Sequence, residues 1–267
     1  ADAGLRRTDA QSAVSVNGRI LDGMADLLFT SRLTAHYSLH REGIAAERCF
    51  NTGPLIADML QLALPQVPDP ASVVAASGAS RDVLRHKSGY ALATVSLGGE
   101  GVDESHAATV VTILRNMSAT LPVLWLVDET TSAVIGRQRL DVQLRQAAGA
   151  VVMLPRMSYA QSIGLLAQAR VLVAGNQQWL IEEALALGRP PVTLGDSAEA
   201  AGADDAGNGF AGLDMNRAMR RLSEALAAAD MGGEPQPPAA GAVSQRMIDQ
   251  LRQLIPKQRR NRLVAVV

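Results

Sequence analysis

Short apolar segments alternate with longer amphipathic segments between Tyr90 and Leu194, and this alternation most constrains the fold. The apolar segments are too short for helices and predict strands at 91–96, 122–127, 150–154, 171–173 and 191–194. The segments between them place apolar residues at helical spacing and predict helices at 104–119, 130–147, 158–169 and 178–187. Strands that are apolar throughout are buried on both faces, which indicates a parallel sheet covered by helices. We therefore expect a doubly wound α/β domain over residues 85–230, with at least five parallel strands.

The first part of the chain reads as shorter alternating helical and strand pieces. Ser31 is expected to cap a helix that is closed by Gly43. Pro54 suits the first turn of a helix over residues 54–63. Strands are expected at 27–29 and 49–52.

Two segments interrupt this pattern and suggest where domains begin and end. Residues 64–89 contain several prolines and small residues, which are typical of a linker. A stretch rich in Gly, Pro and Ala at 231–242 separates a helix near 214–229 from a last helix at 243–255. We accordingly divide the chain into residues 1–65, a linker at 66–89, a domain at 90–230, and a linker with a C-terminal helix at 231–267.

The composition excludes several classes of protein. The formal net charge is −1, so the chain lacks the basic field of an electrostatic nucleic-acid binder. A single cysteine, Cys49, excludes an internal disulfide framework and a multi-cysteine metal site, and it fits a reducing, cytoplasmic compartment. The apolar runs are far shorter than the ~20 residues that span a bilayer, so no membrane segment is expected.

In doubly wound domains, ligands bind at the carboxyl ends of the strands, near the point where strand order reverses. The segments expected to line such a site are those that follow each predicted strand. They are Ser96–Glu100, Asp128–Glu129, Pro155–Tyr159, Ala174–Gln178 and Gly195–Glu199.

Several short motifs, in one order along the chain, resemble the non-hydrolysing UDP-N-acetylglucosamine 2-epimerases. In the first part, residues 2–6 (DAGLR) are similar to the family's E-A-G-L-R. Residues 25–30 (ADLLFT) with 41–44 (REGI) resemble "SDLLFAPT … REGI", and residues 51–60 resemble "VTGNTVIDAL".

The second part carries further motifs of the same family. Residues 94–103 resemble the "TLHRPENVD" loop, and Leu154-Pro155 with Ser158-Tyr159 resembles the "PLSY" turn. Residues 182–190 resemble "QEEA…LGKP".

The resemblance implies a GT-B-like α/β fold with two Rossmann-like domains, the first of them only partly present in residues 1–65. The family has roughly a hundred residues before E-A-G-L-R, so we expect a fragment or a truncated relative. The implied activity is conversion of UDP-GlcNAc to UDP-ManNAc, an isomerase reaction in cell-envelope polysaccharide synthesis that needs neither metal nor cofactor. The implied partners are UDP or a UDP-sugar, and a homodimer is possible; no nucleic acid and no membrane are expected.

The family reaction removes UDP from the sugar by elimination and adds it back after the configuration at C2 has changed. It needs a base, an acid and donors for the diphosphate. The resemblance carries two candidate catalytic carboxylates to this chain, Asp2 and Glu100. It also carries over candidate substrate-binding residues, with Glu183 at the position of the family's ribose-binding carboxylate. They are Ser96, Tyr159, Gly175, Asn176, Glu183 and Glu199.

The chain departs from the family where charge matters most. Ser15-Val16 replace an acidic pair, Ser96 or Leu97 replaces the histidine of the T-L-H-R loop, and two arginines are missing after Gly195. We therefore expect impaired catalysis. Two alternatives stay open: a non-catalytic nucleotide-sugar-binding or assembly protein of the same fold, and a GT-B glycosyltransferase.

Other reactive side chains favour structural roles. His36 and His40 are spaced like two metal ligands on a helix, but no third ligand is evident, which favours a solvated face. Cys49 is expected to be a buried thiol rather than a nucleophile.

Overall fold

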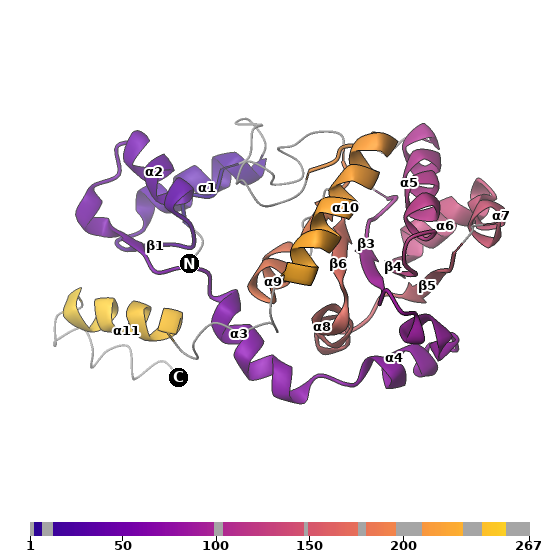
Figure 1. Cartoon of the computed structure of the whole chain (residues 1–267). Helices are drawn as coiled ribbons and strands as arrows, with labels where there is room; N and C mark the ends of the chain where they lie inside the picture. The colour runs from indigo at the N-terminus through magenta and orange to yellow at the C-terminus, as the bar shows by residue number, and fades with distance from the viewer. Residues whose placement is uncertain are drawn as a thin grey trace. The chain divides into compact units, whose positions relative to one another are not determined.

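The computed structural model describes residues 3–6, 13–98, 104–146, 149–175, 180–195, 210–231 and 242–254 (Figure 1). The chain forms two compact units. The smaller unit combines residues 1–61 with 238–267, and the larger unit comprises residues 62–237. Both ends of the chain therefore belong to one unit.

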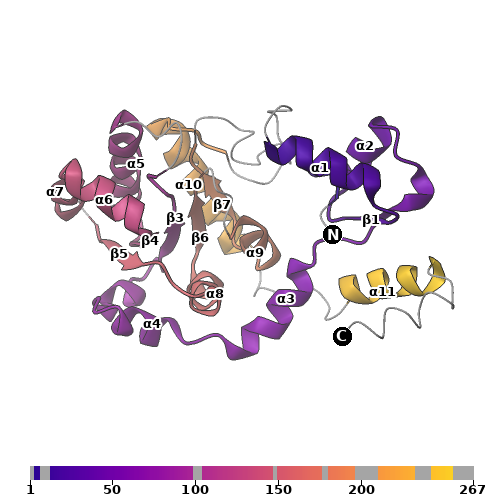
Figure 2. The same cartoon turned by 180° about the vertical axis from the view of Figure 1, so that it is seen from behind.

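The larger unit is built on a five-stranded parallel sheet, seen from two sides in Figures 1 and 2. The strand order is β5-β4-β3-β6-β7. Ala91 of β3 pairs with Val123 of β4 on one side and with Val171 of β6 on the other. The strands are β3 (Ala91–Thr94), β4 (Val123–Val127), β5 (Val151–Pro155), β6 (Val171–Ala174) and β7 (Pro191–Thr193). The predicted α/β class with a parallel sheet is thus confirmed.

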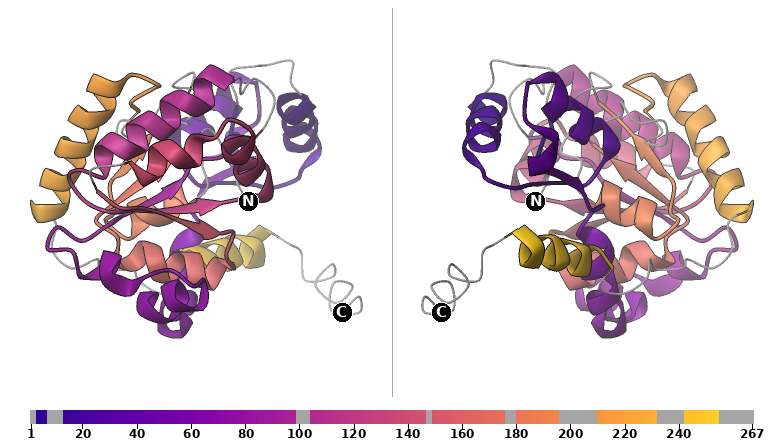
Figure 3. Two further views of the ribbon diagram at one scale, coloured as in Figure 1. Left: turned by 90° about the vertical axis from the view of Figure 1, so that its right-hand side faces the viewer. Right: turned by 90° about the vertical axis from the view of Figure 1, so that its left-hand side faces the viewer.

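Helices cover both faces of this sheet (Figure 3). One face is covered by α5 (Glu104–Met117), α6 (Glu129–Arg137), α7 (Leu140–Arg145) and α10 (Met215–Met231). The other is covered by α8 (Tyr159–Gln168) and α9 (Ile181–Ala186), with α4 (Pro70–Ala76) against α8. Trp125 of β4 is fully buried in the first of these layers, where its indole Nε1 donates to the carbonyl of Val95 at 2.9 Å. The core is otherwise aliphatic, as the low aromatic content of 3% requires.

Two details of the larger unit differ from the sequence-based expectation. The helix predicted at 130–147 is divided into α6 and α7 by Arg139, whose φ of 52° is left-handed and cannot continue a helix. The segment predicted as a linker, 66–89, contains α4, whose Val73 and Val74 are buried. A short helix capped by Asp69 carries too little periodicity to be read from sequence. The segment also includes the 3₁₀ helix η3 (Arg81–Arg85).

The smaller unit contains a sheet of two parallel strands, β1 (Leu28–Thr30) and β2 (Cys49–Asn51). Its helices are α1 (Ala13–Met24), α2 (Leu33–Arg41), most of α3 (Ile56–Ala63) and α11 (Ala242–Leu254). The 3₁₀ helix η1 (Ala46–Arg48) precedes β2, and a second one, η2 (Leu64–Gln66), follows α3 at the start of the larger unit.

Polar contacts join the two chain segments of this unit. The Asp58 carboxylate on α3 accepts hydrogen bonds from the Ser244 amide at 2.7 Å and the Ser244 hydroxyl at 2.6 Å, and so caps α11. Arg246 on α11 donates twice to the carbonyl of Thr52, which follows β2. The last helix is therefore an integral part of the smaller unit rather than an appendage.

A charged cluster joins two of the motifs that carry the family resemblance. Arg6 donates to both oxygens of Glu42, at 2.7 and 2.6 Å, and to Asp22 at 2.8 Å. The amide of Gly4 also donates to Asp22. Gly4 has a φ of 77°, and an added Cβ would lie 2.3 Å from the carbonyl oxygen of Ala35, so only glycine fits there.

Two helix starts in this unit were predicted wrongly. Ser31 does not cap α2: the N-cap position is Arg32, with no side-chain cap, and the Ser31 hydroxyl is buried. Helix α3 begins at Ile56, two residues after Pro54. Gly43 closes α2 with a φ of 81°, as its position predicted.

Candidate functional site

The order of the strands in the larger unit places a switch point between β3 and β6. Gly175 directly follows β6 and lies against Val95, which follows β3. An added Cβ on Gly175 would lie 3.2 Å from both the Cα and the Cγ1 of Val95. The two strand ends therefore approach each other closely because Gly175 has no side chain.

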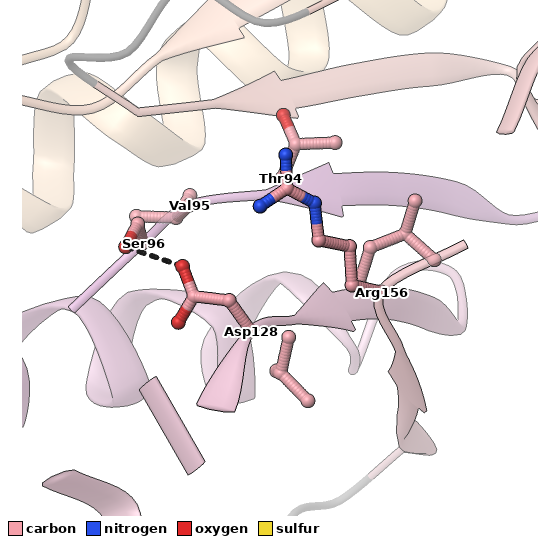
Figure 4. Close-up of a pocket in the computed structure, with 7 residues that line it drawn as sticks. Thr94, Val95, Ser96, Asp128 and Arg156 are labelled. Carbon is pink, nitrogen blue, oxygen red and sulfur yellow. Dashed lines mark hydrogen bonds between the residues drawn. The ribbon is translucent and has the colours of Figure 1, made fainter. Parts of the chain in front are cut away.

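A hollow of about 220 Å³ opens on the β4 side of this point (Figure 4). It is lined by residues at the ends of three neighbouring strands: Thr94, Val95, Ser96, Leu126, Val127, Asp128 and Arg156. Figure 4 shows the Arg156 side chain extending from the end of β5 toward the ends of β3 and β4.

Asp128 holds two strand ends of the hollow together. One carboxylate oxygen accepts the Thr131 amide at 2.6 Å and so caps α6. The other accepts the Ser96 hydroxyl at 3.0 Å, and the Thr131 hydroxyl accepts the Leu97 amide at 3.0 Å. Burial alone would raise the pKa of Asp128, but these hydrogen bonds and the charge of Arg156 lower it below its usual value. Asp128 is therefore a carboxylate at neutral pH, with both oxygens in use.

Tyr159 and Glu183 form a second polar group of the larger unit. Tyr159 opens α8, whose start is fixed by a capping box between Ser158 and Gln161, and Glu183 lies in the first turn of α9. Burial raises the pKa of the Glu183 carboxyl. Burial and the neighbouring Glu183 charge together raise the pKa of Tyr159 to about 12. The Tyr159 hydroxyl is buried and has no hydrogen-bond partner among the described residues, so the two groups are neighbours without a well-formed bond.

This arrangement suits a polar organic ligand. A half-buried carboxyl and an unbonded phenol can exchange hydrogen bonds with hydroxyl groups. An arginine at the next strand end can bind an anion. These features together fit a ligand that carries both a polyhydroxylated part and a phosphate.

The structure brings together two pairs of the residues predicted from sequence to bind substrate. Ser96 and Gly175 both adjoin Val95, and Tyr159 and Glu183 adjoin each other. Ser96 lines the hollow, but its hydroxyl is engaged by Asp128. The other predicted residues, Asp2, Glu100, Asn176 and Glu199, lie outside the described residues.

Sequence reasoning placed Arg156 in a segment expected to line the site, Pro155–Tyr159, but gave this side chain no role. It missed Thr131, whose hydroxyl accepts the Leu97 amide and which belongs to no recognisable motif. The only signal for Arg156 was its position, two residues after a predicted strand that ends at Leu154.

The histidine pair and the cysteine considered in the sequence lie in the smaller unit. The Nε2 atoms of His36 and His40 lie 3.2 Å apart on α2. Throughout the described residues, no group of three or more His, Cys, Asp and Glu side chains is placed to hold a metal ion. Cys49 is buried as expected, and burial raises the pKa of its thiol.

Among the helices that the structure describes, none is long and apolar enough to cross a membrane.

Comparison with known proteins gives one family. The family model described as UDP-N-acetylglucosamine 2-epimerase matches residues 1–252. Among curated protein sequences, none matches significantly.

Solved structures of the same description share the fold. A UDP-GlcNAc 2-epimerase from Methanocaldococcus jannaschii is 18% identical with a TM-score of 0.69, over 94% of this chain and 69% of its own. A UDP-N-acetylglucosamine 2-epimerase from Rickettsia bellii is 18% identical with a TM-score of 0.66, over 95% of this chain and 66% of its own. A UDP-GlcNAc 2-epimerase from Neisseria meningitidis, bound to UDP-GlcNAc, is 16% identical with a TM-score of 0.66, over 94% and 68%. This chain thus spans about two thirds of the length of each of these proteins.

Proposed function

We propose that this chain, which belongs to the UDP-N-acetylglucosamine 2-epimerase family, binds UDP or a UDP-sugar at the carboxyl ends of β3, β4 and β6. One observation carries the proposal. Glu183, at the position of the family's ribose-binding carboxylate, lies half-buried beside Tyr159 in the unit whose switch point is at Gly175. The relative from Neisseria meningitidis was solved with UDP-GlcNAc bound, which supports the same class of ligand.

The role of Glu183 is to accept hydrogen bonds from the ribose hydroxyls. Its raised pKa reflects a carboxyl that is removed from water, so a ligand hydroxyl would supply the hydrogen bonds that solvent does not. Tyr159 has an unbonded hydroxyl at the same place and can complete the pocket.

Titration calorimetry with UDP tests this role. Replacing Glu183 with Gln should weaken UDP binding by about tenfold or more, because a hydrogen bond to a charged group is worth roughly 1.5–3 kcal/mol. Glu182→Gln is the matched control, since it removes the same charge from the adjacent position of α9 and should leave UDP affinity nearly unchanged. Equal affinities for the wild type and Glu183→Gln would contradict the proposal.

We further propose that catalysis is impaired in this chain. The family's T-L-H-R histidine falls on Ser96 or Leu97, and the Ser96 hydroxyl donates to Asp128 instead of facing a ligand. Loss of one electrostatic donor at a developing charge typically costs about 10²–10³ in rate. A non-catalytic nucleotide-sugar binder of the same fold is therefore the second candidate function.

NMR of UDP-GlcNAc in D₂O separates the two candidates. A binder should perturb the UDP-GlcNAc signals without forming UDP-ManNAc or exchanging the C2 proton. A slow epimerase should show both changes at a low rate. Rapid turnover would overturn the claim of impaired catalysis and would point to Asp2, Glu100 or Glu199 as replacements for the missing groups.

A further inference from the structure

Arg156 is a cation at the candidate site that no motif of the chain accounts for. It lies at the carboxyl end of β5 and lines the same hollow as Ser96 and Asp128 (Figure 4). Within the part of the chain that the structure describes, Arg156 has no ion pair and no side-chain hydrogen bond. Some arginines elsewhere do pair, as Arg6 does with Glu42 and Arg145 with Asp141, whereas Arg156 lies at a strand end that lines a hollow.

Asp128 is the carboxylate that lines the hollow together with Arg156, but among the described residues it forms no ion pair with this arginine. Its two oxygens already accept from the Thr131 amide and the Ser96 hydroxyl. The carboxylate also caps the N-terminus of α6, whose dipole offsets part of its negative charge. Arg156 acts on Asp128 through its charge and lowers the pKa of that group, yet it forms no ion pair with it. The guanidinium therefore faces the hollow, and its N–H groups donate no hydrogen bond to any of the described residues.

The ligand that best fits this cation is a phosphate group. A guanidinium presents five N–H donors in a planar fork that matches two phosphate oxygens. The backbone of Val95 and Gly175 brings the hollow next to the switch point, where the proposed nucleotide would lie. A phosphate of that nucleotide could then reach Arg156 while its ribose remains near Glu183.

We propose that Arg156 binds a phosphate of the bound uridine nucleotide and supplies the positive charge that Ser96 cannot carry. This proposal rests on the proposed function. It predicts that the two residues contact different parts of the ligand. Glu183 binds the ribose of the nucleoside, and Arg156 binds the phosphate, which only a nucleotide carries.

Calorimetry with three ligands tests this prediction. UDP, uridine and inorganic diphosphate would be titrated into the wild type, Arg156→Ala, Arg156→Lys and Arg137→Ala. Arg137 is a matched control because it is exposed in the last turn of α6, at the opposite end of that helix from Asp128. Circular dichroism would establish that each variant folds.

We expect Arg156→Ala to weaken UDP by about 10–100-fold and to leave uridine unchanged, because only the charge-assisted contact to phosphate is lost. Arg156→Lys should recover part of the loss, since it restores the charge but not the planar fork. Arg137→Ala should match the wild type. Raising the ionic strength should reduce the difference in UDP affinity between the wild type and Arg156→Ala, because salt screens the attraction between the guanidinium and the phosphate.

The possible failures are distinguishable. If Arg156→Ala binds UDP as the wild type does, or loses UDP and uridine equally, the role of Arg156 is overturned while the nucleotide site stands. If the wild type binds diphosphate through Arg156 but binds neither UDP nor uridine, the anion site stands and the proposed function fails. If the wild type binds none of the three ligands, both proposals fail.

Discussion

The two units of this chain follow the same alternation of strand and helix but are stabilised differently. The larger unit buries a broad apolar core between five strands and the helices on one face of its sheet. The smaller unit has two strands and buries fewer apolar side chains among its described residues: one cluster comprises Ala3, Leu28, Leu39 and Cys49, and Phe29, Ala35, Ala57, Leu60 and Val243 are also buried. Its segments are joined in addition by carboxylates that accept from Arg6 and from the start of α11. A narrow sheet offers little apolar surface to bury, so directional polar contacts take a larger share of the stability.

Exposure on α1 shows the same contrast. Leu21 and Met24 are 66% and 78% exposed, although they repeat at helical spacing. In α5 of the larger unit, the equivalent apolar positions Val110, Ile113 and Leu114 are fully buried. Periodicity alone therefore does not tell how much a helix contributes to a core.

The largest expected effect is on the larger unit. Trp125→Ala removes a fully buried ring and should destabilise that unit by about 3–5 kcal/mol. It also leaves the Val95 carbonyl without its indole donor. Urea unfolding followed by circular dichroism measures the change. Met153→Ala, at a 41% exposed position of β5, is the control and should change stability little. A comparable loss in both variants would show that the buried layer is not what stabilises this unit.

The charged cluster of the smaller unit should give the next largest effect. Arg6→Ala leaves Asp22 and Glu42 without their shared cation and should cost about 1–3 kcal/mol. Hydrogen exchange at the β1 and β2 amides would detect the loss in this unit. Arg85→Ala is the control, because its pair with Asp82 is largely exposed and should be worth under about 1 kcal/mol. If exchange in Arg6→Ala speeds up equally in both units, the charged cluster does not stabilise the smaller unit in particular.

The cap of α11 should give a smaller effect. Asp58→Ala removes the acceptor for the Ser244 amide and hydroxyl and should destabilise the attachment of α11 by about 1–2 kcal/mol. Trypsin should then cut faster after Arg246. Asp249→Ala, on an exposed turn of the same helix, should leave the cleavage rate close to that of the wild type. An unchanged rate in Asp58→Ala would mean that other contacts hold α11.

Lowering the pH should produce the smallest change in stability, and this change should differ between the two units. The hydrogen bond from Arg6 lowers the pKa of Glu42, and the pKa of Asp58 is also lowered, because the bonds from Ser244 outweigh burial. A lowered pKa adds stability that is present above the unfolded values of about 3.9–4.3 and is lost as the pH falls through the folded values. In the larger unit, the lowered pKa of Asp128 also makes stability fall in acid, but the raised pKa of Glu183 makes stability rise as that carboxyl is protonated. As the pH falls below about 4, the amide protection factors should therefore fall first in the smaller unit. Protection factors that fall first in the larger unit would reverse this assignment.

Much of the larger unit could be predicted because its strands are apolar throughout. Period and length alone located β3, β4, β5, β6 and β7 to within a few residues. The break at Arg139 could not be predicted, since a left-handed conformation is uncommon for a residue other than glycine and no sequence signal marks it.

The candidate site was predictable in outline only. The switch-point rule located the strand ends, and the family resemblance singled out Gly175 and Glu183. The pairing of Tyr159 with Glu183 joins residues on two helices, and the engagement of Ser96 by Asp128 joins two strand ends. Such contacts depend on three-dimensional proximity, and single-sequence patterns do not encode it.

The bond between Asp58 and Ser244 has a consequence for synthesis on the ribosome. The larger unit is continuous in sequence, so it can fold as soon as residues 62–237 have emerged. Residues 1–61 emerge earlier, yet their unit lacks α11 until residue 254 has been made. At roughly 5–20 residues per second, the first segment waits about ten seconds or more for its partner. Of the two units, the one whose first segment emerges earlier is therefore the one that is completed later.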